Sequence, residues 1–140
     1  MTVTPVFLDP SVLLLAVGGD HPLRAACREV LAGGGDGRLR LHLSVEGGQE
    51  FLFHRLRRVG RERAIREFDH VERLVVWHPF DLDILRASRD LVSRGHARGR
   101  DAVHAATALA AGFGAIVSTD GDFDGIPGLV RLDPTAGLPG

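Results

Sequence analysis

The chain has 140 residues and a formal net charge of −1, and its 44% hydrophobic and 25% charged residues are typical of one soluble globular domain. All 17 basic residues are arginines, which excludes sites built on a lysine, and the single Cys27 excludes an intramolecular disulfide or a cysteine-rich zinc site. We find no signal peptide and no apolar run of the roughly 18–20 residues that cross a bilayer, so we expect a cytoplasmic protein without a membrane segment.

Apolar runs that alternate with helical patterns predict the first elements of secondary structure. A strand is expected at residues 5–8, followed by a short helix at 11–19 and a second helix at 21–34. The glycine-rich stretch 32–37 is interpreted as a flexible connection. It leads into residues 38–44, whose strict alternation of apolar and polar side chains predicts a second strand.

The rest of the chain continues this alternation. Helices are expected from about residue 48 to a break at Gly60, and then at 61–71, 81–95 and 101–114. Strands are expected at 74–77, 115–118 and 129–132. Because helices separate the strands, the sequence predicts an α/β fold with a mainly parallel sheet and helices on both of its faces. We expect one domain over residues 1–134 and a loose C-terminal tail over residues 135–140.

Acidic residues follow several of the predicted strands. Asp9 directly follows the first strand, and Asp120 directly follows the fourth. Glu46 and Glu50 lie after the second strand, and Asp101 opens the helix that precedes the fourth. In a parallel sheet, ligands bind beyond the carboxyl ends of the strands, so we expect these acids to share one edge of the sheet.

A shared position is unfavourable for carboxylates unless a cation lies between them, because like charges raise each other's pKa. A hard dication with oxygen ligands, Mg²⁺ or Mn²⁺, removes this conflict and activates water for attack on a phosphodiester. Simpler interpretations remain open for each acid. Asp9 and Asp101 are also typical helix caps, and Asp120, Asp122 and Asp124 are typical turn residues.

Four stretches resemble a known family. "VFLDPSVLLLA", "SVEGGQEFLFHRL", "RGRDAVHAATAL" and "AIVSTDGDF", in this order and spacing, resemble PIN-domain ribonucleases of the VapC toxin type. The resemblance implies a three-layer α/β/α PIN-like domain and a Mg²⁺- or Mn²⁺-dependent endoribonuclease that hydrolyses RNA with metal-activated water. It also implies a homodimer and a VapB-like antitoxin partner, for which the helices before residue 71 are the expected groove. The alternative is a catalytically silent PIN-like module that binds RNA or a partner.

The resemblance also implies roles for single residues. The implied catalytic acids are Asp9, Glu50, Asp101 and Asp120, of which Asp9, Asp101 and Asp120 are the implied metal ligands. Glu46 is a rival to Glu50 for the second acid. Thr119 matches a position that orients the first acid, while Asp122 and Asp124 are expected to assist through bound waters. His104 is interpreted as a packed or supporting residue rather than a catalytic one.

Two sets of arginines are candidates for RNA binding. Arg98 and Arg100 are adjacent to Asp101 in the sequence, and we expect them to contact substrate near the metal. The stretch from Arg55 to Arg66 carries six arginines, and its interpretation stays open between a phosphate-binding surface and a solvated helix face.

Overall fold

The computed structural model describes residues 2–138 and follows the predicted alternation of strands and helices. In chain order the elements are β1 (Thr4–Phe7), α1 (Pro10–Val17), α2 (Arg24–Asp36), β2 (Leu39–Ser44), α3 (Val45–Val59), α4 (Arg61–Leu74), β3 (Val75–His78), α5 (Leu82–Ser93), α6 (Gly99–Ala110), β4 (Ala115–Val117), the 3₁₀ turn η1 (Gly121–Phe123), β5 (Val130–Leu132) and the 3₁₀ turn η2 (Pro134–Ala136). All five strands therefore lie where the apolar runs predict them.

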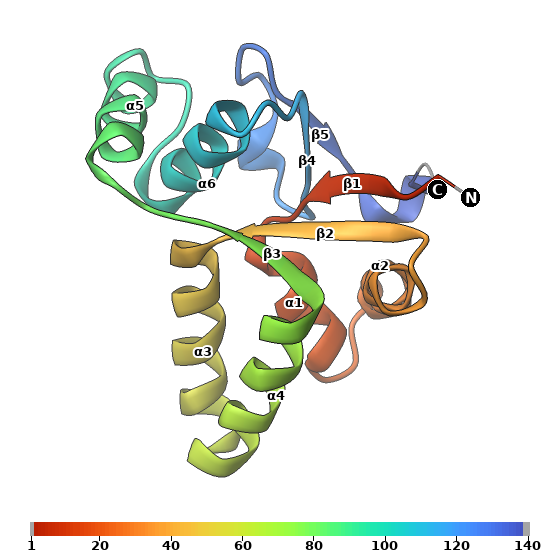
Figure 1. The fold of residues 1–140 in the computed structure, drawn as a ribbon. Helices are drawn as coiled ribbons and strands as arrows, with labels where there is room; N and C mark the ends of the chain where they lie inside the picture. The colour runs from red at the N-terminus through yellow and green to blue at the C-terminus, as the bar shows by residue number, and fades with distance from the viewer. Residues whose placement is uncertain (1, 139–140) are drawn as a thin grey trace.

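The strands form a parallel sheet. β1 pairs with β2 and β2 with β3, while β4 pairs with β5, all in parallel register. A parallel bridge between Leu8 and Val117 and a hydrogen bond from the Asp9 amide to the Val117 carbonyl join β1 to β4. The strand order across both parts is thus β3-β2-β1-β4-β5, and the carboxyl ends of β1 and β4 lie next to each other (Figure 1).

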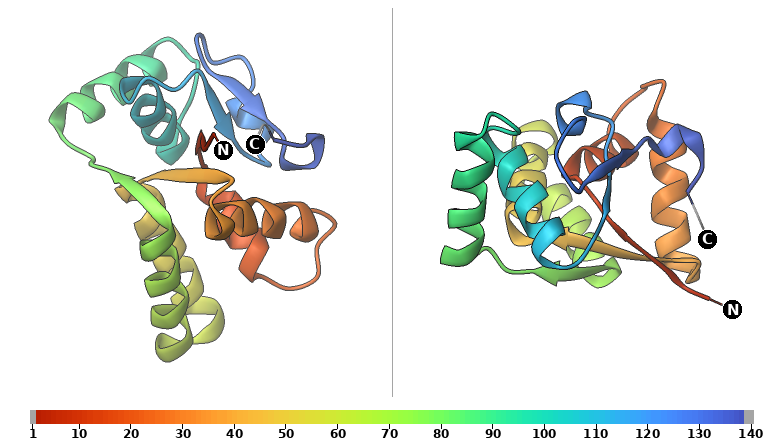
Figure 2. Two further views of the ribbon diagram at one scale, coloured as in Figure 1. Left: turned by 45° about the vertical axis from the view of Figure 1, so that its right-hand side comes forward. Right: turned by 90° about the horizontal axis from the view of Figure 1, so that it is seen from above.

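Helices cover both faces of this sheet, which confirms the three-layer α/β/α architecture. α1 to α4 lie on one face, and α5 and α6 lie on the other (Figures 1 and 2). The core on the first face includes Leu41, Leu43 and Phe51, and the core on the second face includes Phe7, Ile116 and Phe123. α3 and α4 form a hairpin that projects away from the sheet, so only the first turns of α3 lie near the strand ends (Figure 1).

The structure corrects the end of α2 and the start of α3, for which close packing and a helix cap are the respective reasons. The glycine-rich stretch is not a flexible connection, because α2 continues to Asp36. A side chain on Gly33 or Gly34 would come within 3 Å of Leu39 or Leu41, so glycines let this helix lie directly against β2. α3 begins at Val45 rather than at Gly48, because Ser44 caps it by accepting the Gly47 amide proton at 2.9 Å.

The C-terminal segment joins the rest of the fold as far as the structure describes it. Pro134–Ala136 form the turn η2, in which the Asp133 carboxylate accepts the Thr135 amide proton. Leu138 packs against the core of the first face, so residues 135–138 of the expected loose tail lie on the domain. Residues 139–140 are outside the described part of the chain. None of the helices within residues 2–138 has both the length and the hydrophobicity needed to cross a bilayer.

Candidate active site

The acids predicted at the strand ends lie together at the carboxyl edge of the sheet. Side chains at this edge form two groups, and within each group the ligand atoms all lie within 4.8 Å of one another. The first group comprises Asp9, Glu50 and His104, which come from the end of β1, from α3 and from α6. The second comprises Asp101, Asp120 and Asp122, which come from the first turn of α6 and from the segment after β4. Asp9 and His104, which are far apart in the sequence, are therefore neighbours in the fold.

Neither Asp9 nor Asp101 is used as a helix cap. Asp9 occupies the N-cap position of α1, but its side chain makes no capping hydrogen bond. The N-cap of α6 is Arg98, and Asp101 lies inside the first turn. Asp120 does serve the turn that follows it, because its Oδ1 accepts the Asp122 amide proton at 2.9 Å. The capping interpretation is therefore wrong for the first two acids, and Asp120 combines turn formation with a place in the cluster.

Burial and mutual repulsion make the cluster electrostatically unfavourable in the absence of a cation. Burial is the largest cause that raises the pKa of Asp101 to about 6, and the charges of Asp9, Asp120 and Asp122 add to it. Burial also raises the pKa of Asp9, against the lowering effect of hydrogen bonds from Ser11 and Ser118. These mutual effects show that the two groups are electrostatically coupled. A set of carboxylates held in this way fits a hard dication, which would relieve the repulsion.

The metal-free protein is expected to lose stability between about pH 4 and pH 6 on account of Asp101. Its pKa is about 6 in the folded state and 3.8 in the unfolded chain. Its contribution is therefore present below pH 4 and is lost as the pH rises through 6. Urea unfolding at about pH 4 and about pH 6 should show a smaller pH dependence in Asp101→Asn than in the wild type. Equal pH dependence in the two proteins would contradict this electrostatic picture.

Glu50, and not Glu46, lies beside Asp9. Glu50 Oε1 is 3.5 Å from Arg100 Nη1, and its Oε2 is 3.7 Å from His104 Nε2. Burial alone would raise the pKa of Glu50, but His104 and Arg100 lower it below its ordinary value. Glu46 contacts the other side of the Arg100 guanidinium, at 3.6 Å, and belongs to neither group of clustered side chains. The geometry therefore favours Glu50 as the second acid.

The residue that orients Asp9 is Ser118, which the sequence analysis missed. Ser118 Oγ donates to Asp9 Oδ2 at 2.9 Å and accepts the Asp120 amide proton at 2.9 Å, so it links two of the acids. The prediction assigned this role to Thr119 and was wrong. Side chains alternate along an extended segment, and the buried Ser118 continues the inward face of Ile116. The Thr119 amide instead donates to Ser11 Oγ at 3.4 Å.

Asp122 and Asp124, the remaining acids of the turn after β4, make different contacts. Asp122 is exposed and belongs to the second group of clustered acids. Asp124 points to Arg131, whose Nε donates to Asp124 Oδ1 at 2.9 Å. An ion pair with a neighbouring strand therefore accounts for Asp124, and of the two residues only Asp122 is placed to assist at the cluster.

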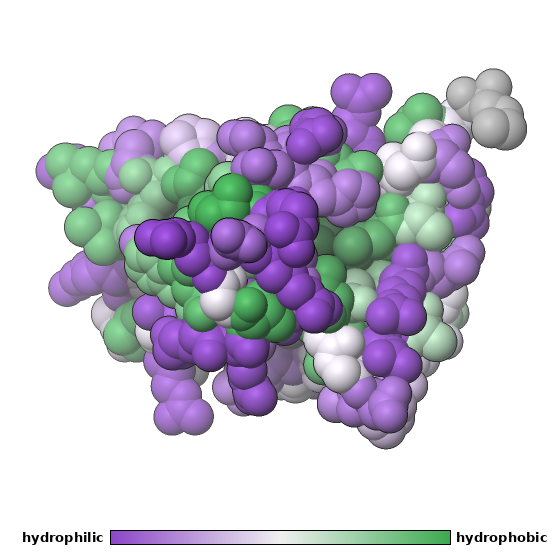
Figure 3. All heavy atoms as spheres, turned by 90° about the horizontal axis from the view of Figure 1, so that it is seen from below, coloured by the Kyte–Doolittle hydropathy of each residue, from purple (hydrophilic) through white to green (hydrophobic). Residues whose placement is uncertain are grey.

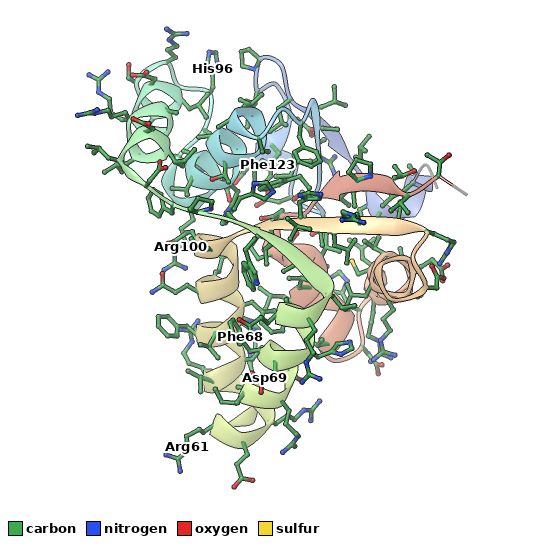
Figure 4. The ribbon with its side chains drawn as sticks, in the orientation of Figure 1. Arg61, Phe68, Asp69, His96, Arg100 and Phe123 are labelled. Atoms are coloured by element: carbon green, nitrogen blue, oxygen red, sulfur yellow. The ribbon has the colours of Figure 1, made fainter. Side chains whose placement is uncertain are left out.

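The candidate RNA-binding arginines are placed unequally. Arg100 is 61% exposed at the mouth of the cluster, near the first turn of α3 (Figure 4). Arg98 lines a hollow of about 320 Å³ together with Asp122. In the stretch from Arg55 to Arg66, by contrast, Arg55 is buried and paired with Glu67 at 2.7 Å. Arg61 lies at the far tip of the α3–α4 hairpin, away from the acids (Figure 4). This stretch is therefore not one continuous phosphate-binding surface.

Comparisons with known proteins show the family to which the chain belongs. A family model described as "PIN domain" matches residues 6–129. Ribonuclease VapC7 of Mycobacterium tuberculosis is 34% identical over 135 residues, which cover 94% of this chain and 92% of that protein.

Solved structures are similar in fold at lower sequence identity. The VapBC2 complex of Rickettsia felis, bound to a DNA fragment from its promoter, contains a chain that matches with a TM-score of 0.70 and 16% identity, over 92% of this chain and 98% of that chain. Mycobacterium tuberculosis VapC20, a toxin that cleaves the sarcin-ricin loop, matches with a TM-score of 0.70 and 18% identity, over 84% of this chain and 92% of that chain.

Proposed function

Because this chain belongs to the VapC-type PIN-domain family, we propose that it is a metal-dependent endoribonuclease and the toxin of a toxin–antitoxin pair. The observation that carries the proposal is the convergence of Asp9, Glu50, Asp101 and Asp120 at one edge of the sheet. Four separate elements contribute these side chains. No single helix cap or turn requires such an arrangement, whereas a hard dication does.

The residues divide the chemistry between them. Asp9, Asp101 and Asp120 are the proposed ligands of Mg²⁺ or Mn²⁺. The bound ion supplies a Lewis acid that activates water and stabilises the charge that develops on the phosphate. Ser118 holds Asp9 and the Asp120 backbone in place, and Glu50 provides a ligand or a base that acts through water. Asp122 assists from the exposed side of the cluster. No nucleophilic side chain is required.

Arginines at the mouth are the proposed contacts for the RNA backbone. Arg100 and Arg98 flank the acids from the start of α6 and are exposed to solvent. Guanidinium groups pair well with phosphate, and they offset the negative charge of the cluster towards an approaching RNA strand. In the free protein Arg100 pairs with Glu46 and Glu50 at 3.5–3.6 Å, so substrate phosphate would compete with these carboxylates for the same guanidinium.

The helices before residue 71 offer two hollows for an antitoxin peptide. One, of about 410 Å³, is lined by apolar side chains of α3, α4 and β3, including Phe53, Phe68 and Trp77. The other, of about 590 Å³, lies between α1 and the α3–α4 hairpin and includes Leu14 and Leu15. Figure 3 shows apolar side chains between strongly hydrophilic ones on the face seen from below. We propose a VapB-like antitoxin as the partner on these helices, and a homodimer of the toxin.

Purified protein and a labelled RNA test the activity. We expect Mg²⁺ or Mn²⁺ to support internal cleavage, and we expect EDTA to stop it. Because water rather than the ribose hydroxyl is the proposed nucleophile, the products should carry linear phosphates and no cyclic phosphate ends. Binding of RNA without cleavage at any metal concentration would identify the protein as a silent PIN-like module instead.

Separate substitutions of the two glutamates test which one is the second acid. Glu50→Gln is expected to lower kcat about a hundredfold, because it removes a charged group beside Asp9 that acts in the transition state. Glu46→Gln removes a carboxylate that pairs with Arg100 Nε at 3.6 Å and belongs to neither group of clustered side chains, and we expect its kcat to change by less than about fivefold. A larger loss in Glu46→Gln than in Glu50→Gln would reverse the assignment.

A further inference from the structure

His104 is a buried histidine with one ring nitrogen facing the acids. It lies on α6 one turn after Asp101, and it is 0% exposed. Its Nδ1 is 2.9 Å from Ser44 Oγ. Its Nε2 is buried without a partner at hydrogen-bond distance, and Glu50 Oε2 is a carboxylate oxygen that faces it, at 3.7 Å. A polar ring atom is therefore enclosed next to Asp9 and Glu50, the two acids of its group.

The hydrogen bonds at Ser44 indicate which ring nitrogen of His104 carries the proton. Ser44 Oγ accepts the Gly47 amide proton at 2.9 Å, and its own hydroxyl proton is buried and needs an acceptor. Within residues 2–138, His104 Nδ1 is the acceptor that the structure places in reach of this proton. If Ser44 donates to Nδ1, the neutral ring carries its proton on Nε2, on the side of Glu50.

We propose that His104 is a positioning residue, whose ring is fixed by Ser44 so that its Nε2 proton holds the Glu50 carboxylate beside Asp9. The inference rests on the proposed function, since it concerns the same site. The Ser44–His104 pair joins the end of β2 and the cap of α3 to α6, and thus the helix of Glu50 to the helix of Asp101. Arg100 holds the other Glu50 oxygen, but it is exposed and available to substrate. His104 is enclosed and stays in place.

Two substitutions of His104 separate positioning from packing. The amide nitrogen of glutamine can take the place of Nε2, so His104→Gln keeps a donor for Glu50. Asparagine is shorter by one methylene and reaches only as far as Nδ1, so His104→Asn keeps a polar group near Ser44 but loses that donor. We expect His104→Asn to lower kcat by about 10- to 100-fold with little change in KM for RNA, and His104→Gln to retain most of the activity.

A second readout does not depend on RNA cleavage. Nitrogen NMR of the metal-free wild type should show the neutral ring of His104 with its proton on Nε2, and Ser44→Ala should remove this preference. Mn²⁺ titration followed by electron paramagnetic resonance should show weaker binding in His104→Asn than in His104→Gln. If the wild type cuts no RNA, the proposed function fails, and these two measurements still decide the role of His104.

Three results would overturn the inference. One is a proton on Nδ1 rather than Nε2 in the wild type. Another is an equal loss of kcat in His104→Asn and His104→Gln, together with lower thermal unfolding temperatures in both variants. This result would show that His104 contributes only packing. The third is unchanged kcat and Mn²⁺ affinity in His104→Asn while Asp9→Asn is inactive, which would leave the proposed function intact and remove His104 from it.

Discussion

The Asp9→Asn protein is expected to cleave RNA about a thousandfold more slowly than the wild type while keeping its fold. A loss of about 4 kcal/mol in transition-state stabilisation by the metal corresponds to this factor. Asp9 is 4% exposed, and burial raises the pKa of its carboxyl group, so the ionised side chain is unfavourable in the metal-free protein. Asparagine keeps the shape and an acceptor for Ser118 without the charge. We therefore expect it to unfold at the same temperature as the metal-free wild type, or a higher one.

Asp83→Asn is the matched control for this substitution. Asp83 lies exposed in the first turn of α5 and belongs to neither group of clustered acids, so its variant should cleave RNA like the wild type. The cleavage rate of each protein is measured over a Mg²⁺ titration up to saturation. Weaker Mg²⁺ binding then appears as a higher midpoint concentration, separately from a lower rate at saturation. Wild-type rates in a well-folded Asp9→Asn protein would remove Asp9 from the catalytic site.

Removing the carboxylate of Glu67 is expected to destabilise the protein by about 3–5 kcal/mol. Arg55 is 4% exposed on α3, and its guanidinium donates to both Glu67 oxygens, at 2.7 and 3.2 Å. Glu67→Ala would leave a buried guanidinium without its counter-charge. Urea unfolding at constant pH measures the loss. This outcome would establish that the buried Arg55–Glu67 pair supports the α3–α4 hairpin.

The matched control is Arg63→Ala. Arg63 Nε pairs with Glu67 Oε2 at 3.3 Å, but the Arg63 side chain is 57% exposed. An exposed pair contributes little, so the expected change in the free energy of unfolding is below about 1 kcal/mol. Equal losses in Glu67→Ala and Arg63→Ala would show that burial does not govern this ion pair.

The sequence was sufficient to predict the fold and the neighbourhood of the acids, for a clear physical reason. Strands of a parallel sheet end at a common edge, so an acid that directly follows a strand has a predictable location. Asp9 and Asp120 illustrate this. Their mutual proximity follows from β1 and β4 being neighbours, and the structure gives that pairing through the bridge between Leu8 and Val117.

The remaining details depend on tertiary packing that no local pattern encodes. Consecutive side chains of the extended segment after β4 point to opposite sides, and the sequence does not indicate whether Ser118 or Thr119 is the one that faces Asp9. Gly33 and Gly34 are helical because β2 lies against them, although a run of glycines typically indicates a loop. Arg55 looks like its exposed neighbours in the sequence, and only its burial against Glu67 distinguishes it.

Crystals of the protein soaked in Mn²⁺ provide the most direct test of the account. Anomalous diffraction locates the ion without any assumption about activity. The account predicts a peak between Asp9, Asp101 and Asp120, with at least two of their carboxylate oxygens at about 2.1–2.2 Å from it. A peak elsewhere, or none at concentrations that support RNA cleavage, would contradict the claim that these carboxylates form a dication site.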